Sequence, residues 1–308
     1  MYYTIKTNEV VGIIYNMNTQ CYLCKNKNLV TRKGSVRDDK NLKILECNSC
    51  GLVFLSSFKH IEKSFYENSK MHTTDNSIIP DDYAGLDISE ILKTCKTDDD
   101  RRYKQYEELI VNKDILDFGC GAGGFLLNAK YRAKNCYGVE LDNQYIRHYT
   151  TNNLEVIQDI DNFNKKVDIV FMFHVLEHID DPLKLLDKMK SKIIDGGSLI
   201  IEVPNADDAL LTLYENDGFS NFTYWSPHLF LYNAQTLSDL MKMAGYKIDY
   251  IKQFQRYTLS NHLYWLSNNK PGGHQKWSFL DSEELYGSYA SALGKINKCD
   301  TIIGSFRL

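Results

Sequence analysis

The chain of 308 residues lacks any apolar run long enough to cross a bilayer, which argues against a membrane span. Its most apolar N-terminal run is VVGIIY, which is too short for a signal-peptide core and has no small-residue cleavage site after it. No internal repeat or low-complexity tract is visible. We therefore expect a cytoplasmic protein with one large and one small folded unit.

The sequence also lacks the surplus of positive charge that duplex-binding proteins usually carry. Lys and Arg number 36 against 40 Asp and Glu, for a net charge of −4. This balance argues against nucleic acid as the main partner. The segment between the two cysteine pairs is modestly basic, however, so a nucleic-acid-binding zinc protein stays open as an alternative; its basic residues are Lys25, Lys27, Arg32, Lys33, Arg37, Lys40 and Lys43.

Half of the eight cysteines stand in two C-x-x-C pairs, within CYLC and CNSCG. In a reducing cytosol this spacing favours a metal over disulfides, and four thiolates complete the tetrahedral coordination of a structural zinc ion. The predicted ligands are Cys21, Cys24, Cys47 and Cys50. Gly51 fits a turn in which backbone amides point at sulfur. A redox pair and unmetallated thiols remain the alternatives.

Strand-like and helix-like segments alternate from Asp114 onward, which predicts a doubly wound, mainly parallel α/β sheet. Before them, residues 98–110 read as a helix with an acidic N-terminus. The expected strands are DILDF, CYGVEL, LEVIQD, VDIVFMF, GGSLIIEVP, YKIDYIKQF and a final TIIGSFRL.

The decapeptide ILDFGCGAGG places glycines after the first strand, where the backbone can bring a ligand to the next helix. Gly119, Gly121 and Gly124 formally satisfy G-x-G-x-x-G, so a dinucleotide site must be considered. Asp117 would repel a pyrophosphate but can hold an ammonium group. Glu140 can accept both hydroxyls of a ribose. S-adenosylmethionine carries the ribose and the ammonium without a pyrophosphate, so we expect it as the cofactor.

LDFGCGAGG resembles the first motif of the class I methyltransferases, and GVEL resembles their second. FMFHVLEHIDDP and GGSLIIEVPN resemble the stretches around their fourth and fifth strands. The likeness covers residues 98–254 and implies a seven-stranded, Rossmann-like methyltransferase sheet. The cofactor-binding residues that it implies are Asp117, Gly119, Gly121, Gly123, Glu140, Leu141, Asp159, Ile160, Phe173 and His174.

HVLEH places His174 and His178 four residues apart with Glu177 between them. The zinc-protease motif is H-E-x-x-H, in which the glutamate follows the first histidine directly. The order here differs, so we expect no metal at this stretch. We expect His174 to line the cofactor pocket through its backbone, and His178 to be structural or to face the substrate.

A cysteine-rich unit ahead of this core resembles the zinc-containing sugar C-methyltransferases and related methyltransferases of surface-glycan pathways. The resemblance implies a small zinc-ribbon-like lobe and a linker in which Tyr66 and Tyr83 reach the carboxylate of the cofactor. It also implies proton-transfer groups in NFTYWSPHLFLY, the loop after the fifth strand, where His228 and Tyr224 are the candidate catalytic residues. His suits this task because its ordinary pKa lies near neutrality. Simple packing of the loop is the alternative.

Two departures from that family favour oxygen over carbon as the methyl acceptor. The family commonly has Glu before the histidine of this loop, whereas Pro227 stands here. The family also carries a long C-terminal domain, whereas this sequence has 54 residues after Phe254. Transfer to oxygen needs only one base and good positioning. We therefore expect O-methylation of a sugar or of a phosphorylated or nucleotide-linked precursor in capsule or lipopolysaccharide biosynthesis.

Residues 256–300 form an insertion that we expect to begin and end at the ligand face, because a parallel sixth strand precedes it and an antiparallel seventh strand follows it. The candidate substrate residues are Arg256, His262, Trp265 and His274. Aromatic side chains can stack on sugars, and an arginine can pair with a phosphate. Packing of a helical lid is the alternative for each of them.

These expectations divide the chain into a zinc-binding lobe (1–60), a helical linker or lid (61–113), a methyltransferase core (114–255), the insertion (256–300) and a final core strand (301–308). The leading hypothesis is an S-adenosylmethionine-dependent methyltransferase with structural Zn²⁺ that acts on a small-molecule substrate. A sugar C-methyltransferase and a zinc-containing NAD-dependent dehydrogenase are the other enzymatic alternatives.

Overall fold

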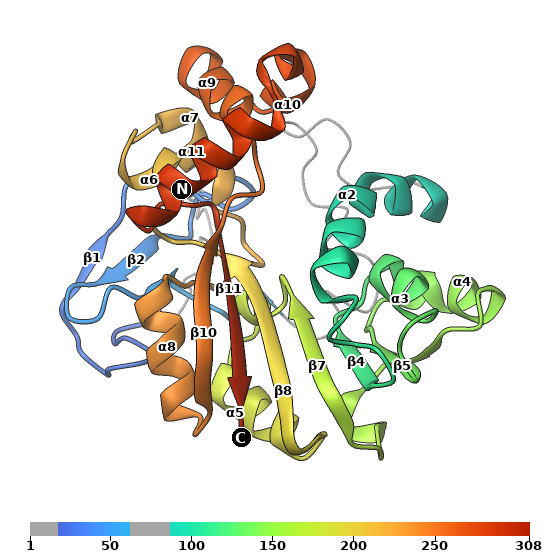
Figure 1. Ribbon diagram of the computed structural model, residues 1–308. Coiled ribbons are helices and arrows are strands. Elements are labelled where there is room, and N and C mark those ends of the chain that lie inside the picture. The colour runs from blue at the N-terminus through green and yellow to red at the C-terminus, as the bar shows by residue number, and fades with distance from the viewer. Residues whose placement is uncertain (1–17, 62–86) are drawn as a thin grey trace, which may run out of the picture.

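The computed structural model describes residues 18–61 and 87–308 and arranges them around two β-sheets (Figure 1). The larger sheet has seven strands in the order β10-β11-β8-β7-β4-β5-β6. Its strands are β4 (Asp114–Phe118), β5 (Asn135–Val139), β6 (Glu155–Ile157), β7 (Val167–Phe173), β8 (Ile193–Pro204), β10 (Lys247–Phe254) and β11 (Thr301–Arg307).

The larger sheet is parallel except for β11, which runs antiparallel to both β8 and β10. The predicted seven-stranded, doubly wound sheet is therefore confirmed, including the reversed last strand. The central strand β7 is buried along nearly all of its VDIVFMF sequence, as expected for a strand that helices cover on both faces.

Helices pack on both faces of this sheet, and the alternation of side chains along each strand decides which face each residue meets. Tyr106 and Phe125 lie with Phe171 on one face, whereas Leu186 and Leu237 lie with Met172 on the other. The first face is covered by α2 (Ile88–Tyr106) and α3 (Gly124–Ala129), beside α4 (Ile146–Thr151), and the second by α5 (Pro182–Lys190) and α8 (Ala234–Met243).

The helix expected at residues 98–110 begins earlier, at Ile88, and ends at Tyr106. The acidic run of residues 98–100 therefore lies in the middle of α2 and does not interact with the N-terminal end of its dipole. Basic side chains pair with it instead: Asp98 contacts both Arg101 and Arg256. Asp99 and Asp100 form ion pairs within the helix, with Arg102 and Lys96. The Asp98–Arg256 ion pair is the tertiary contact that local sequence does not show.

The smaller sheet belongs to residues 18–61, which we call the cysteine lobe. Its own strands are β1 (Leu29–Thr31), β2 (Ile44–Cys47) and β3 (Val53–Leu55). The fourth strand, β9 (Phe230–Leu231), comes from the loop after β8 and pairs antiparallel with β3. The backbone N–H of Leu55 also donates to the carbonyl of Leu229, 2.9 Å away. The loop after β8 is thus part of the lobe's sheet.

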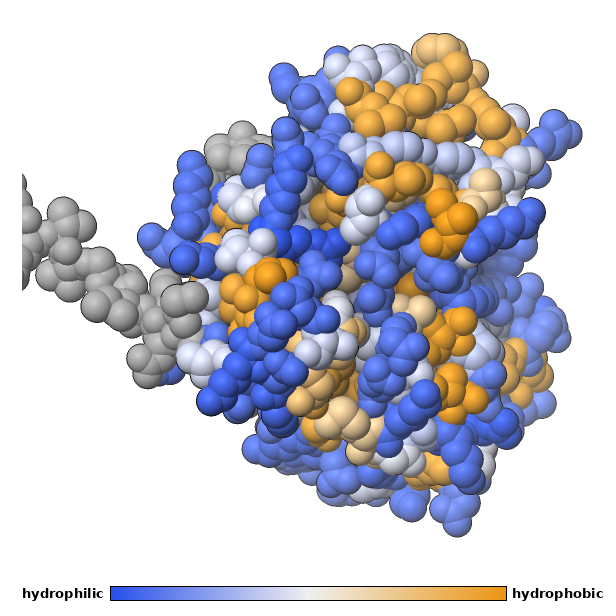
Figure 2. Space-filling model, turned by 90° about the vertical axis from the view of Figure 1, so that its left-hand side faces the viewer, coloured by the Kyte–Doolittle hydropathy of each residue, from blue (hydrophilic) through white to orange (hydrophobic). Residues whose placement is uncertain are grey.

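The segment between β10 and β11 folds into three helices, α9 (Leu259–Asn268), α10 (Gly273–Lys276) and α11 (Glu283–Lys295). They lie above the sheet, next to α6 (Ala209–Thr212) and α7 (Asp217–Thr223) (Figure 1). Figure 2 shows apolar side chains gathered at the top of one face, where these helices lie. The exposed large apolar residues of the insertion include Leu263, Leu266, Phe279, Leu280 and Leu285.

Across residues 18–61 and 87–308, no helix has the length and apolar character needed to cross a membrane.

The aromatic core around Phe230 should determine how firmly the cysteine lobe is held. Its ring lies 5.3 Å from that of Tyr22 and 4.9 Å from that of Phe58, and it is fully buried. We expect Phe230→Ala to lower the free energy of unfolding by about 3–5 kcal/mol in denaturant titrations, because it leaves a cavity between lobe and core. Phe279→Ala is the control, since that ring is 79% exposed; equal effects of the two changes would contradict the prediction.

Candidate functional site

A tight turn at residues 119–124, which we call the glycine turn, joins β4 to α3. Gly119 and Gly123 have φ of 78° and Gly121 has φ of 51°. A side chain at Gly119 would place its Cβ 2.4 Å from Val175, so the turn packs directly on the segment after β7. A Cβ at Gly121 would meet no atom within 4 Å. The turn therefore leaves its backbone open to a ligand at Gly121.

Asp117 is 3% exposed, and its Oδ1 atom has no hydrogen-bond partner among the described residues. Burial raises the pKa of this carboxyl to about 8, Arg102 opposes the shift, and the nearby Asp99 and Glu140 add to it. An unsatisfied buried oxygen is costly, and a ligand ammonium would satisfy it. Asp117 thus fits the role predicted for it.

Glu140 is held in a fixed orientation by two backbone amides. Its Oε2 accepts a hydrogen bond from the N–H of Gly121 and its Oε1 accepts one from Asp142, each at 2.9 Å. A carboxylate oxygen has a second lone pair, so both oxygens can still accept from ribose hydroxyls. The orphaned oxygen of Asp117, the open backbone at Gly121 and the fixed Glu140 together fit S-adenosylmethionine.

The other predicted cofactor residues fall around the same edge of the sheet. Asp159 accepts from the N–H of Asp161 and begins a short 3₁₀ turn that includes the buried Ile160, and Leu141 directly follows Glu140. Phe173 is buried, and the Arg102 guanidinium lies 4.7 Å from its ring centroid. The structure brings these residues to the carboxyl edge, where ligands bind in open α/β sheets.

A buried carboxylate that sequence reasoning missed organises this edge. Glu202, near the end of β8, has no exposed surface and accepts from Arg101 and from Arg102, each at 2.8 Å. Although burial opposes its charge, His174 and the two guanidinium groups hold the pKa of Glu202 well below its usual range. The signal available in the sequence was a glutamate inside the apolar strand LIIEVP.

His174 links this carboxylate to a second one. Its Nε2 lies 3.3 Å from Oε1 of Glu202, and its Nδ1 lies 3.2 Å from Oε1 of Glu177. The residue has φ of 56°, a left-handed conformation that non-glycine residues seldom adopt. Burial opposes protonation of His174, but the two carboxylates raise the pKa of its imidazole. The contacts of its side chain were not expected from the sequence.

His178 and His228 lie side by side, with ring centroids 4.9 Å apart, and Trp225 lies 5.5 Å from His228. The Nδ1 atom of His178 is 2.9 Å from the carbonyl of Pro227. Burial lowers the pKa of His228 to about 3, below the near-neutral value expected from the sequence. Its imidazole is therefore neutral and keeps a lone pair at physiological pH, but it is a weaker base than an exposed histidine. The packing of Val175 on Gly119 connects this group to the glycine turn.

The structure does not place Tyr224 beside His178 and His228. Its ring would touch a Cβ at Gly34, and the charged groups near its hydroxyl are Arg32, Glu46 and Asp208. The side chain is 1% exposed and belongs to the core shared with the cysteine lobe. This environment favours packing over proton transfer.

Of the four candidate substrate residues, only Arg256 lies beside His174. Its guanidinium pairs with Asp98 and lies 3.5 Å from Nε2 of His174. His262 is buried and lies 2.7 Å from the hydroxyl of Tyr289, while Trp265 packs its ring on Phe219 and Phe222. His274 lies beside the ring of Tyr257. His262 and Trp265 pack within the helices above the sheet, whereas His274 is exposed on them. Tyr66 and Tyr83, predicted to reach the cofactor, lie outside the described residues.

The four predicted metal ligands converge in the cysteine lobe, and their sulfur atoms all lie within 4.8 Å of one another. The shortest separations are 3.4 Å for Cys21 and Cys50 and 3.5 Å for Cys24 and Cys47. Zinc–sulfur bonds of about 2.3 Å in a tetrahedron place the sulfurs about 3.8 Å apart. Gly51 has the positive φ expected of it, 78°. The cluster therefore fits a zinc ion.

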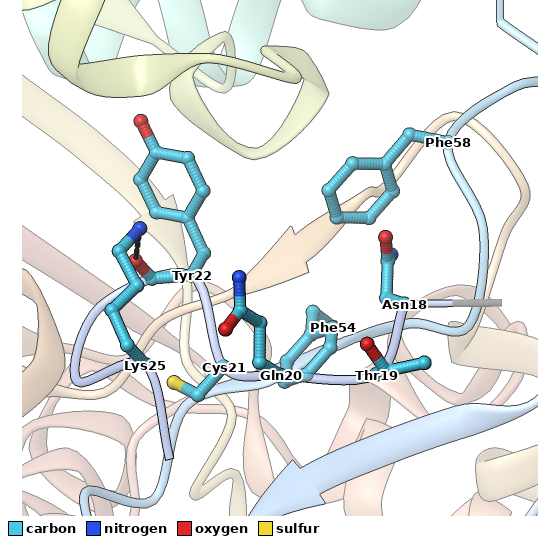
Figure 3. Close-up of a pocket in the computed structure, with 8 residues that line it drawn as sticks. All are labelled: Asn18, Thr19, Gln20, Cys21, Tyr22, Lys25, Phe54 and Phe58. Atoms are coloured by element: carbon cyan, nitrogen blue, oxygen red, sulfur yellow. Dashed lines mark hydrogen bonds between the residues drawn. The ribbon is translucent and has the colours of Figure 1, made fainter. Parts of the chain in front are cut away.

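A pocket of about 280 Å³ opens on the cysteine lobe and not at the glycine turn (Figure 3). Tyr22 and Phe58 flank it, and the Lys25 ammonium donates to the carbonyl of Tyr22. The hydroxyl of Tyr22 donates to Asp181 at the start of α5. These contacts make Tyr22 a link between the lobe and the core.

Comparison with known proteins matches residues 82–251 to a family described as Methyltransferase domain. A tRNA U34 carboxymethyltransferase from Campylobacter fetus is 28% identical over 102 residues, 30% of this chain and 36% of that protein. A mitochondrial ubiquinone biosynthesis O-methyltransferase from Candida albicans is 30% identical over 134 residues, 36% of this chain and 39% of that protein. The chain spans only about a third of the length of the first such relatives.

Among solved structures, a SAM dependent methyltransferase from Archaeoglobus fulgidus aligns with a TM-score of 0.46 and 20% identity, covering 72% of this chain and 95% of that one. An S-adenosylmethionine-dependent methyltransferase from Clostridium acetobutylicum aligns with a TM-score of 0.43 and 15% identity, covering 68% and 90%.

The raised pKa of Asp117 predicts a pH-dependent affinity for S-adenosylhomocysteine, because the ammonium of this ligand binds the ionised carboxylate more tightly than the protonated acid. Below about pH 8 binding must expel the proton, so affinity should rise with pH by up to about tenfold per unit and level off above pH 8. Calorimetric titration across this range measures the effect, and Asp117→Asn should flatten it. Glu155→Gln, at an exposed position of β6, is the control and should keep the rise between pH 7 and 8. An unchanged profile in Asp117→Asn would contradict the assignment.

Proposed function

Because the chain belongs to the methyltransferase domain family, and is thus an S-adenosylmethionine-dependent methyltransferase, we propose that it methylates a hydroxyl oxygen of a sugar. The acceptor class that we propose is a phosphorylated or nucleotide-linked sugar precursor of a surface polysaccharide. The observation that carries this proposal is the position of His228: its loop completes the sheet of the cysteine lobe, and its ring lies beside that of His178, which follows β7.

Each residue of this edge has a proposed task. Asp117 holds the ammonium of the cofactor, Glu140 holds its ribose, and Gly121 gives its backbone room. The bound cofactor supplies an activated methyl group. His228, neutral at physiological pH, accepts the proton that the acceptor hydroxyl loses. The ring of Trp225 beside it offers an aromatic surface for a sugar.

The alternatives differ in what they require of the same residues. For transfer to carbon, the resembling enzymes have a Glu directly before the histidine, and this chain has Pro227 at that position. An NAD-dependent dehydrogenase would have to place a pyrophosphate near Asp117, whose burial disfavours a second anion. Stabilisation by S-adenosylhomocysteine but not by NADH in a thermal-shift assay separates a methyltransferase from a dehydrogenase.

A tRNA acceptor is the main alternative, because several relatives are named tRNA U34 carboxymethyltransferase. Three of the basic side chains of the cysteine lobe are engaged within the protein. Arg32 donates to the carbonyl of Ala206, Lys33 pairs with Asp217, and Arg37 lies over the ring of Trp225. This arrangement weakens the case for a phosphate-binding surface on the lobe. Binding of tRNA that falls steeply with salt would support that acceptor instead.

For the cysteine cluster we propose a structural role with Zn²⁺ bound. Four thiolates fill a tetrahedral site and leave no position for water or substrate. The ion would fold the cysteine lobe, and the lobe would hold β9 and the His228 loop through the β3–β9 pairing. On this view the acceptor lies between the lobe and the 256–300 insertion.

The acceptor can be identified by incubating the enzyme and S-adenosylmethionine with nucleotide-sugars, surface-glycan intermediates and tRNA. Mass spectrometry then detects a product that is heavier by one methylene group. Methylation of a sugar hydroxyl supports the proposal, whereas modification of tRNA alone overturns it.

With that substrate, His228→Ala should lower turnover by about 10²–10⁴-fold while binding of S-adenosylhomocysteine stays near its wild-type level. The physical reason is that the acceptor proton loses its nearest neutral base. Tyr224→Phe is the matched control, because it removes a buried hydroxyl in the lobe core and should leave turnover nearly unchanged. Turnover near the wild-type rate in His228→Ala would exclude this residue as the base.

Removal of zinc should loosen the cysteine lobe before the larger sheet. After chelation, or in Cys47→Ser, we expect faster hydrogen exchange in β2, β3 and β9, because the metal no longer fixes the turns that hold them. Exchange in β7 and β8 is the internal control and should stay slow. Full activity in zinc-free protein whose lobe exchanges rapidly would show that the lobe does not support the site.

A further inference from the structure

A second group of possible metal ligands lies at the carboxyl edge of the larger sheet, apart from the four cysteines. Ligand atoms of Glu177, His178 and His228 all lie within 4.8 Å of one another. We propose that these three side chains bind one divalent transition-metal cation. Two of them stand side by side after β7, whereas the third comes from the loop that joins the cysteine lobe, so spacing along the chain does not reveal the set.

The strongest support is an unsatisfied carboxylate oxygen. Glu177 is fully buried, and its Oε2 atom has no hydrogen-bond partner in the described part of the chain. A buried carboxylate oxygen without a partner is costly, and a cation would remove that cost. Its other oxygen, Oε1, lies 3.2 Å from Nδ1 of His174, and this contact fixes the orientation of the carboxylate.

The orientation of His178 also fits coordination. A carbonyl oxygen can only accept, so the contact of 2.9 Å between Nδ1 and the carbonyl of Pro227 requires Nδ1 to carry the proton. The lone pair of His178 then resides on Nε2, the remaining ring nitrogen. Metal-binding histidines characteristically donate their second N–H to a carbonyl or carboxylate in this way. Pro227 precedes His228, so the same loop orients one ligand and supplies another.

Geometry permits closure of the set around an ion. Bonds of about 2.0–2.2 Å to nitrogen and oxygen place neighbouring ligands about 3–3.5 Å apart. His178 and His228 are only partly buried, so modest rotation of their rings brings the atoms together. Two imidazoles and one carboxylate suit Zn²⁺, Mn²⁺, Fe²⁺ or Co²⁺ better than Ca²⁺ or Mg²⁺, which prefer oxygen.

Three protein ligands leave coordination positions open, and a hydroxyl oxygen of the acceptor is a ligand that fits there. This role for the ion rests on the proposed function, whereas binding of the ion rests on the side-chain geometry alone. With the ion present, the lone pair of His228 would be used in coordination, so His228 would not act as the base. The cation would lower the pKa of the acceptor hydroxyl, and the released proton would pass to solvent water. Whether His228 acts as the base or as a metal ligand, the proposed reaction is the same transfer of a methyl group to the acceptor oxygen.

The test is a Co²⁺ titration of protein whose cysteine cluster already holds zinc, followed by absorption spectroscopy. Wild-type protein should bind one further equivalent, with the d–d bands of a nitrogen and oxygen site and without thiolate-to-cobalt charge transfer. Glu177→Gln and His228→Ala should each weaken this binding at least about 100-fold. The matched controls are Glu155→Gln on β6 and His148→Ala on α4, which should bind cobalt as the wild type does.

Absence of the additional equivalent in wild-type protein overturns the proposal, as does unchanged binding in both variants. If Glu177→Gln fails to fold, His228→Ala decides the question, because that side chain is partly exposed. The titration involves no methyl transfer, so its outcome is independent of the acceptor. Methyl transfer that is lost on removing this ion supports the catalytic role, whereas cobalt binding without any sugar methylation would count against the proposed function only.

Discussion

The pairing of β3 with β9 is the contact on which the arrangement of the site depends. Two residues of the core chain, Phe230 and Leu231, complete a sheet whose other strands belong to the cysteine lobe. Because backbone hydrogen bonds fix register as well as position, the loop that carries His228 cannot shift without moving the lobe. The lobe that carries the cysteine cluster therefore bears on the position of His228, the proposed base.

A second constraint is the burial of Glu202. A carboxylate without exposed surface must be paired, and here Arg101, Arg102 and His174 supply the partners. Both arginines belong to α2, which covers the glycine turn so closely that a Cβ at Gly124 would lie 2.0 Å from Asp99. His174 in turn contacts Glu177. One buried charge thus connects α2, which covers the glycine turn, to Glu177, a proposed metal ligand.

The sequence predicted what local patterns encode. The strands, the glycine turn, the reversed last strand and the convergence of the cysteines follow from periodicity and spacing. Sequence reasoning missed β9, because two residues carry no periodicity, and it began α2 ten residues late, because the acidic run resembled an N-terminus. It also gave no sign that His178 and His228, fifty residues apart in the chain, lie side by side. Contacts between distant segments supplied everything that the patterns could not.

The insertion between β10 and β11 leaves the larger sheet and returns to it at one edge, between two strands whose antiparallel pairing begins at Phe254 and Thr301. A segment attached in this way can be shortened, lengthened or exchanged without changing the register of any strand or the contacts of Asp117 and Glu140. Evolution can therefore alter the segment that we propose as a cover for the acceptor while the cofactor chemistry stays constant. Related chains that share the core and differ here would form a natural series of acceptor preferences on one catalytic scaffold.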